Sequence, residues 1–176
     1  MVSKLTRVCW ERLFYPSAQL PLPPITIKRS FLSSFSINTK LKEGDILRKE
    51  RSFTHEEVVK YSQLSQDSNP IHLDSAQARK AGFKDTVVHG MLYAALFPSI
   101  IAFHFPGAIY VSQTLQFKAP VCIEDNLLAE VQALELREHR QKYRVRFATK
   151  CFRKEGMLLV LDGEAIALLP NLLYAG

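Results

Sequence analysis

The amino-acid sequence predicts an α+β fold in which an antiparallel β-sheet wraps around one long buried helix. Residues 90–103 are apolar on nearly every side of a helix, which is typical of a helix enclosed by the rest of the fold. Later segments are strand-like, several with apolar and polar residues in clear alternation, which indicates antiparallel strands. The strand-like segments are residues 46–53, 109–117, 127–136, 143–151 and 157–169.

The elements before the buried helix follow from local signals. Thr54 and Glu57 have the spacing of a capping box, which predicts a helix over residues 55–66. A second, shorter helix is predicted over residues 75–81, because Asp74 is a favourable N-cap.

Turns and breaks divide the second half of the chain. Pro98 has no backbone N–H, so it is predicted to kink the buried helix or to end its regular part. Hairpin turns are predicted at residues 137–140 and 153–156, where polar residues separate the strand-like segments.

The net charge of +6 is concentrated at the N-terminus. Residues 1–39 carry five basic side chains and one acidic one, whereas the remaining 137 residues carry 18 and 16. So balanced a body is not typical of a nucleic-acid-binding protein. The composition of residues 1–39 is typical of a mitochondrial transit peptide, with a disordered tail as the alternative. We therefore expect a leader over residues 1–39, a single domain over residues 40–176, and a location in the mitochondrial matrix.

A disulfide framework, a structural metal and a membrane span are all not expected. Cys9, Cys122 and Cys151 lie far apart and have no zinc-binding or C-x-x-C spacing. The longest apolar run, residues 91–103, is too short to cross a bilayer.

The segment D-S-N-P-I-H, from Asp67 to His72, is predicted to carry the chemistry. A carboxylate and an imidazole on one short loop can hold a single water molecule between them. Pro70 fixes its own φ and favours an extended Asn69, so the loop is stiff. Stiffness matters because an acid–base pair must stay within hydrogen-bond reach of one reacting site. Taken alone, the same residues also fit an ordinary turn.

Two further segments carry a family resemblance. V-H-G-M at residues 88–91 opens the buried helix, and Q-T-L-Q-F-K-A-P follows at residues 113–120. With D-S-N-P-I-H, they make residues 44–170 resemble the MaoC-like, hot-dog-fold (R)-specific enoyl-thioester hydratases, and with the leader the mitochondrial members that act in organellar fatty acid synthesis. The resemblance implies a hot-dog fold, a hydro-lyase without metal or other cofactor, a homodimer, and an acyl thioester carried by acyl carrier protein or coenzyme A.

The resemblance also implies roles for single residues. Water is added reversibly across the double bond of a trans-2-enoyl thioester, and Asp67 and His72 are expected to handle its protons. The N–H of Gly90 is the expected donor to the thioester oxygen, because it opens a helix. The residues expected to support the site or to bind substrate are Asn69, His89 and Gln113.

Several of these roles have alternatives. Asn69 also fits a loop-organising residue, His89 also fits a helix cap, and Gln113 faces either the acyl channel or a buried backbone group. Four basic residues fit either the phosphates of coenzyme A or an acidic carrier protein, or an ordinary solvated surface; they are Arg79, Lys80, Lys84 and Lys118.

The chain departs from the family pattern at two positions. Gln66 stands where a glycine is common, just before the catalytic aspartate. Ala95 stands where many relatives carry a serine that helps to hold the catalytic carboxylate. Both departures bear on how Asp67 is oriented.

Two other functions remain alternatives. The hot-dog fold also hosts thioesterases, and a fold does not fix a reaction. A non-catalytic RNA-binding subunit is the other alternative, because four basic residues alternate along one predicted strand and share a face of the sheet. They are Lys142, Arg144, Arg146 and Lys150.

Overall fold

The computed structural model describes residues 39–175. The predicted leader, residues 1–39, lies outside these residues except for its last position. The strands are β1 (Ile46–Arg51), β2 (Ile109–Gln113), β3 (Gln116–Phe117), β4 (Leu127–His139), β5 (Lys142–Arg153) and β6 (Leu158–Leu169). The helices are α1 (His55–Ser65), α2 (Pro70–Leu73), α3 (Ser75–Lys80), α4 (Gly90–Ala94), α5 (Leu96–His104) and the 3₁₀ turn η1 (Glu155–Met157).

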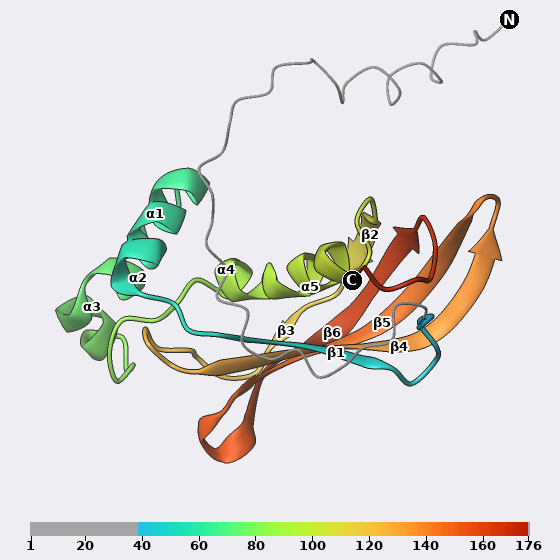
Figure 1. Cartoon of the computed structure of the whole chain (residues 1–176). Coiled ribbons are helices and arrows are strands. Elements are labelled where there is room, and N and C mark those ends of the chain that lie inside the picture. Colours follow the sequence, from blue (N-terminus) through green and yellow to red (C-terminus); the bar gives the residue numbers. More distant parts are fainter. Residues whose placement is uncertain (1–38, 176) are drawn as a thin grey trace, which may run out of the picture. The chain divides into compact units, whose positions relative to one another are not determined.

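All six strands of the described residues form one antiparallel sheet. Its order is β1-β4-β5-β6-β2, and the short strand β3 also pairs with β6. Helices α4 and α5 lie against the sheet, while α1, α2 and α3 gather near one end of it (Figure 1). The sheet around a central helix confirms the predicted α+β arrangement.

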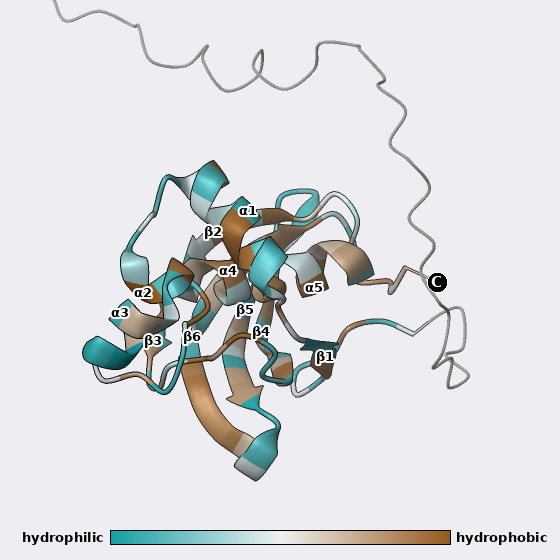
Figure 2. Ribbon diagram, turned by 90° about the vertical axis from the view of Figure 1, so that its left-hand side faces the viewer, coloured by the Kyte–Doolittle hydropathy of each residue, from teal (hydrophilic) through white to brown (hydrophobic). Residues whose placement is uncertain are grey.

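Helix α5 supplies the centre of the core. Phe97, Ile100 and Ile101 are buried against inward residues of the sheet such as Val145 and Phe147. Full burial of one such side chain contributes roughly 1.5–3 kcal/mol. Apolar segments meet where the helix faces the strands, whereas the outer part of α3 is hydrophilic (Figure 2). No helix within residues 39–175 has the length and apolar character needed to cross a membrane.

The buried helix is interrupted at one residue. Ala95 separates α4 from α5, although its own backbone remains close to helical, with φ −63° and ψ −10°. The carbonyl of Ala94 would normally bond the N–H of the residue four positions later, but that residue is Pro98, which has none. Pro98 therefore breaks the helix one turn before its own position, as predicted.

The first two strands after the helix were expected to be one. Residues 109–117 instead form β2 and β3, with a break at Thr114 and Leu115. A Cβ on Gly163 would lie only 1.9 Å from the Thr114 carbonyl oxygen, so the backbones of these two residues are in close contact. The hydroxyl of Thr114 accepts the Glu164 N–H at 2.9 Å, which replaces a regular ladder bond.

The hairpin between β4 and β5 is longer than predicted. Strand β4 continues to His139, which pairs with Lys142, so only Arg140 and Gln141 form the turn. The predicted turn over residues 137–140 was wrong in its first three residues. Cross-strand pairing extended the strands through a sequence that is polar enough to be a turn.

The first and last described residues of the chain are joined by backbone hydrogen bonds. The N–H of Leu41 donates to the carbonyl of Leu172 at 2.8 Å, and Tyr174 N–H donates to the carbonyl of Thr39 at 3.3 Å. The Leu41 side chain is only 2% exposed. Thr39 and Lys40, at the boundary between the predicted leader and the domain, thus contact the C-terminal segment.

Candidate active site

The end of α1 fixes the backbone of Asp67. Gln66 takes the left-handed conformation with φ 60°, which turns the chain out of the helix. The Ser62 hydroxyl then donates to the Asp67 carbonyl at 2.6 Å, and the Asp67 N–H donates to the Ser65 hydroxyl at 3.3 Å. Asp67 is therefore held by its backbone, and its side chain lines the pocket described below.

A short helix, which was expected to be loop, carries His72. Asn69 is the N-cap of α2, and its side chain accepts the Ile71 N–H at 3.3 Å, with Pro70 at the first helical position. The Asn69 N–H in turn donates to the Asp67 carboxylate at 3.2 Å. Asn69 thus organises the loop between the two expected catalytic residues.

The Asp67 carboxylate and the His72 imidazole face each other. His72 Nε2 lies 3.9 Å from Asp67 Oδ2, and the side chains are 11% and 52% exposed respectively. His72 Nδ1 is 2.7 Å from the carbonyl oxygen of Val87, which accepts only, so Nδ1 carries the proton. In the neutral ring Nε2 is then an acceptor that points toward the carboxylate.

His89 lies behind this pair. Its ring stacks on His72 with centroids 3.7 Å apart, and its Nε2 lies 3.1 Å from the Asp67 carbonyl oxygen, to which it donates. The residue is 1% exposed, and its Nδ1 atom has no hydrogen-bond partner within the described residues. Burial lowers the pKa of His89, while the bond to the Asp67 carbonyl opposes this change. Burial is the larger effect, so the pKa of His89 lies below its ordinary value and the neutral ring is favoured.

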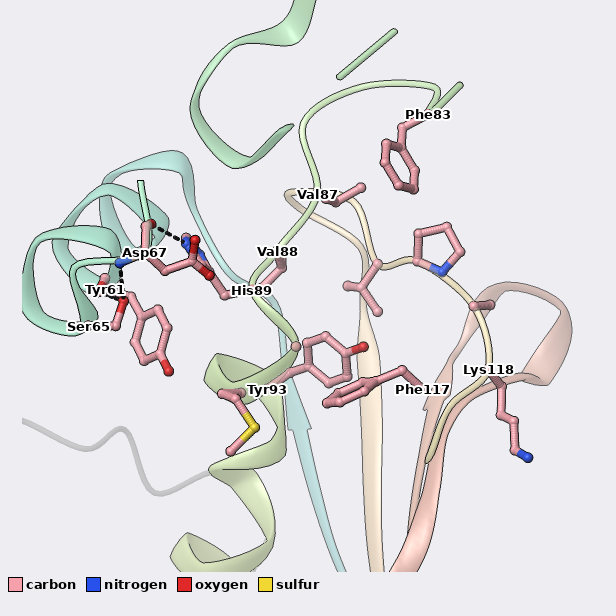
Figure 3. Close-up of a pocket in the computed structure, with 15 residues that line it drawn as sticks. Tyr61, Ser65, Asp67, Phe83, Val87, Val88, His89, Tyr93, Phe117 and Lys118 are labelled. Atoms are coloured by element: carbon pink, nitrogen blue, oxygen red, sulfur yellow. Dashed lines mark hydrogen bonds between the residues drawn. The ribbon is translucent and has the colours of Figure 1, made fainter. Parts of the chain in front are cut away.

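A pocket of about 680 Å³ opens beside Asp67. Asp67 and His89 lie on one side of it and Phe117 and Lys118 on the other, with Tyr93 between them (Figure 3). Its volume lies within the usual range for small-molecule sites. The pocket therefore provides room for an acyl thioester next to the Asp67 carboxylate.

Gly90 also lines the pocket and begins α4. The first N–H groups of a helix have no acceptor within the helix, so that of Gly90 is available to a ligand. A Cβ at this position would lie 2.7 Å from Cε1 of Phe117. The aromatic ring therefore occupies the place that a side chain on Gly90 would take.

Gln113 does not belong to the pocket lining. Its amide group donates to the Thr114 carbonyl at 2.6 Å and to the Thr149 hydroxyl at 3.0 Å, and accepts from the Tyr110 hydroxyl. These bonds brace the strand break after β2 and tie it to Thr149 of β5.

The basic residues are divided between the pocket and the surface. Lys118 lines the pocket, and Lys84 adjoins the pocket residue Phe83. Arg79 lies 4.0 Å from Asp85, and Lys80 is exposed at the end of α3. On the outer face of the sheet, Arg146 pairs with Glu135 and Glu164, which weakens the basic stripe proposed for RNA.

Asp67, His72 and His89 form the cluster that most resembles a metal site. One ligand atom from each lies within 4.8 Å of the other two. The two imidazole rings are nearly parallel, at 25°, and stacked. Lone pairs in the planes of stacked rings do not converge as tetrahedral zinc requires. The geometry thus favours an acid–base site.

Two contributors to this site were missed in the sequence. Ser62 lies one turn after Val58 on the buried face of α1, and a serine on an apolar stripe was a signal of a specific hydrogen bond. Phe117 was part of the quoted Q-T-L-Q-F-K-A-P segment, but nothing in its spacing indicated contact with Gly90. That contact depends on the break between β2 and β3.

An antiparallel sheet lies around a buried helix, and Asp67 and His72 face each other beside the pocket that Asp67 lines. This is the arrangement expected of a hot-dog acyl-thioester hydro-lyase. Residues 37–152 match the family model described as MaoC like domain. The chain belongs to this family.

Relatives agree in fold and in type of reaction. The chain is 53% identical over 148 residues to a mitochondrial 3-hydroxyacyl-[acyl-carrier-protein] dehydratase of Arabidopsis thaliana, covering 84% of this chain and 89% of the relative. It is 40% identical over 132 residues to an (R)-specific enoyl-CoA hydratase of Aeromonas caviae, covering 74% and 96%. A solved (R)-hydratase from A. caviae superposes with a TM-score of 0.69 at 38% identity, covering 74% and 98%. The expected family, hot-dog fold and hydratase or dehydratase class are thereby confirmed.

Proposed function

We propose that this chain interconverts (3R)-hydroxyacyl and trans-2-enoyl thioesters in mitochondrial fatty acid synthesis, with Asp67 and His72 as the catalytic pair. The observation that carries the proposal is the 3.9 Å separation between Asp67 Oδ2 and His72 Nε2 beside the pocket. A water molecule that donates about 2.8 Å hydrogen bonds to two acceptors fits between groups at this separation.

The pair provides the proton transfers of hydration. Asp67 Oδ2 and His72 Nε2 are both acceptors, so a shared water presents its hydrogens to them and a lone pair to C3 of the substrate. As the C3–O bond forms, the pair takes one proton from the water, and that proton is delivered to C2. Hydroxyl and proton arrive from the same side, so addition is to one face. Such groups contribute about 10²–10⁴-fold to a rate.

The start of α4 provides the hydrogen-bond donor that stabilises the negative charge formed in the reaction. Attack at C3 moves negative charge to the thioester carbonyl oxygen, and the Gly90 N–H is a donor positioned for it at the start of the helix. One donor of this kind lowers a barrier by about 2.7–4 kcal/mol. The proposed reaction needs no cofactor, because all the transferred atoms come from water and substrate.

The carrier, the compartment and the assembly belong to the same proposal. The likeness to a mitochondrial relative named for acyl carrier protein supports a matrix enzyme acting on that carrier, with coenzyme A as the alternative. The Thr39 carbonyl accepts the Tyr174 N–H, so Thr39 contacts the domain. We therefore place the cleavage of the leader on the N-terminal side of Thr39. A homodimer is supported by the unpaired edge of β2, where Ile109 and Val111 are exposed.

The test is an assay of the purified protein on a short trans-2-enoyl thioester. Loss of the enoyl absorbance without release of free thiol is expected, and carrier-protein and coenzyme A substrates are compared. In D₂O the product should be a single 2-deuterio-3-hydroxyacyl diastereomer from addition to one face. Thiol release without hydration would instead identify a thioesterase, and absence of turnover on both carriers would contradict the proposal.

A further inference from the structure

The ring of Phe117 stands where substrate and Gly90 would meet. An added Cβ on Gly90 would lie 2.7, 2.9 and 3.2 Å from three carbons of that ring. Carbon atoms pack at about 3.5–4.0 Å, so the ring fills the space beside Gly90 completely. Phe117 thereby forms the pocket wall nearest to the proposed oxyanion donor.

The position of this ring is fixed from two sides. It meets the buried ring of Tyr93 edge to face, with centroids 5.9 Å apart at 88°. Its backbone belongs to β3, where Phe117 pairs with Leu161 after the break that Gly163 permits. The other face is open, since Phe117 is 49% exposed. A half-exposed aromatic held in this way borders the ligand space and does not belong to the core.

The substrate atoms nearest this wall follow from the proposed function. A carbonyl oxygen that accepts from the Gly90 N–H lies about 2.9 Å from the nitrogen. The carbonyl carbon and then C2 come next in the substrate, while the Cα of Gly90, which faces the ring, is bonded to the same nitrogen. An enoyl thioester bound with C2, and not sulfur, on the side of the Gly90 Cα then brings C2 to the Phe117 ring.

We propose that Phe117 is a specificity-determining residue that admits thioesters unbranched at C2 and excludes those with a methyl group there. The inference rests on the proposed function, because Gly90 places the carbonyl oxygen. A C2 hydrogen fits beside the ring, whereas a methyl group must displace it from Tyr93 and from Gly90. Discrimination against one extra carbon typically amounts to a ratio of about 10–200 in kcat/KM.

The test compares hydration of crotonyl and 2-methylcrotonyl thioesters by the unaltered chain and by Phe117→Ala. The ratio of kcat/KM for the linear over the branched substrate should fall by roughly tenfold or more in Phe117→Ala. Phe103→Ala is the matched control, because Phe103 is an exposed phenylalanine of α5 outside the pocket lining. It should leave the ratio unchanged.

The contact itself has a separate readout. Gly90→Ala should lower the Tm of the unaltered chain, and should lower it less in the Phe117→Ala background, where the ring is absent. Strictly additive Tm changes, or a substrate ratio that Phe117→Ala leaves unchanged while linear turnover persists, would overturn this inference alone. Failure of the unaltered chain to hydrate the linear thioester would overturn the proposed function and, with it, this inference.

Discussion

The imidazole of His89 lies flat against that of His72, with ring centroids 3.7 Å apart and planes inclined by 25°. The same side chain donates to the backbone carbonyl of Asp67 at 3.1 Å. One buried residue therefore contacts both members of the proposed catalytic pair. Together with the Ser62 and Ser65 hydroxyls, it holds the backbone of Asp67 in a chain that has Ala95 in place of the serine expected on the buried helix.

Replacement of His89 should slow catalysis because it changes the position of Asp67. His89→Phe keeps a stacked ring but loses the bond to the Asp67 carbonyl, so kcat should fall by up to about 100-fold, the cost of a misplaced group. His89→Gln keeps an N–H at a similar reach and should retain more activity. Steady-state kinetics with thermal melts of each variant make the comparison. Full activity in His89→Phe would show that the bond has no role.

The free energy of unfolding should fall as the medium becomes acidic. Burial lowers the pKa of His89 and of His104 below the ordinary value of 6.5, so the unfolded chain binds more protons than the folded one below that pH. Stability is then lost as the pH falls from about 7 through this window. His72 and Asp67 face His89: the charge of His72 lowers the pKa of His89, and the charge of Asp67 raises it. Denaturant titrations from pH 7.5 to 5 should show a shallower slope in His104→Gln; an equal slope would contradict the assignment.

Gln66 is a target for stabilisation. Its φ of 60° is left-handed, and a residue with a Cβ is about 1–2 kcal/mol less stable there than glycine. Gln66→Gly should therefore raise the free energy of unfolding, by about 1 kcal/mol after the entropy of glycine in the unfolded chain is subtracted. Gln63→Gly, in the same helix, is the matched control and should lower it by about 1 kcal/mol. A lower Tm in Gln66→Gly would contradict the prediction.

The edge of β2 should be the dimer interface. Ile109 and Val111 are 47% and 54% exposed there, and within residues 39–175 no strand pairs with the outer side of β2. Val111→Glu places a charge on that edge and should shift the protein from dimer to monomer in sedimentation-velocity experiments. Met157→Glu changes a residue of similar exposure in the β5–β6 turn and should leave the dimer intact. A monomeric unaltered chain would refute the homodimer.

Local signals predicted most of the fold. The capping box at Thr54 and Glu57 is present as predicted, and so is the break before Pro98. The division of residues 109–117 into two strands was not predictable, because it depends on a close approach between Thr114 and Gly163, which lie 49 positions apart in the sequence. Helix α2 was missed because four residues with a proline at the start also fit a turn.

The candidate site was predictable in its residues but not in its support. Asp67 lies 3.9 Å from His72 and lines one pocket with Gly90, so the motifs indicated which residues come together, while their catalytic roles stay predictions. The bonds that fix them use backbone groups, the Val87 and Asp67 carbonyls, whose positions no side-chain pattern reveals. Gln113 was expected to support the site or to bind substrate. It bonds Thr149 and the backbone and lies outside the pocket lining.

The most direct test of the catalytic pair is the rate of crotonyl-thioester hydration by Asp67→Asn and His72→Ala. Each rate should fall by about 10²–10⁴-fold with the fold intact by circular dichroism, because Asp67→Asn removes the basic carboxylate and His72→Ala removes the imidazole that would take a proton from the shared water. Asp74→Asn, a nearby exposed carboxylate that caps α3, is the control and should stay active. A near-normal rate in either Asp67→Asn or His72→Ala would contradict the account.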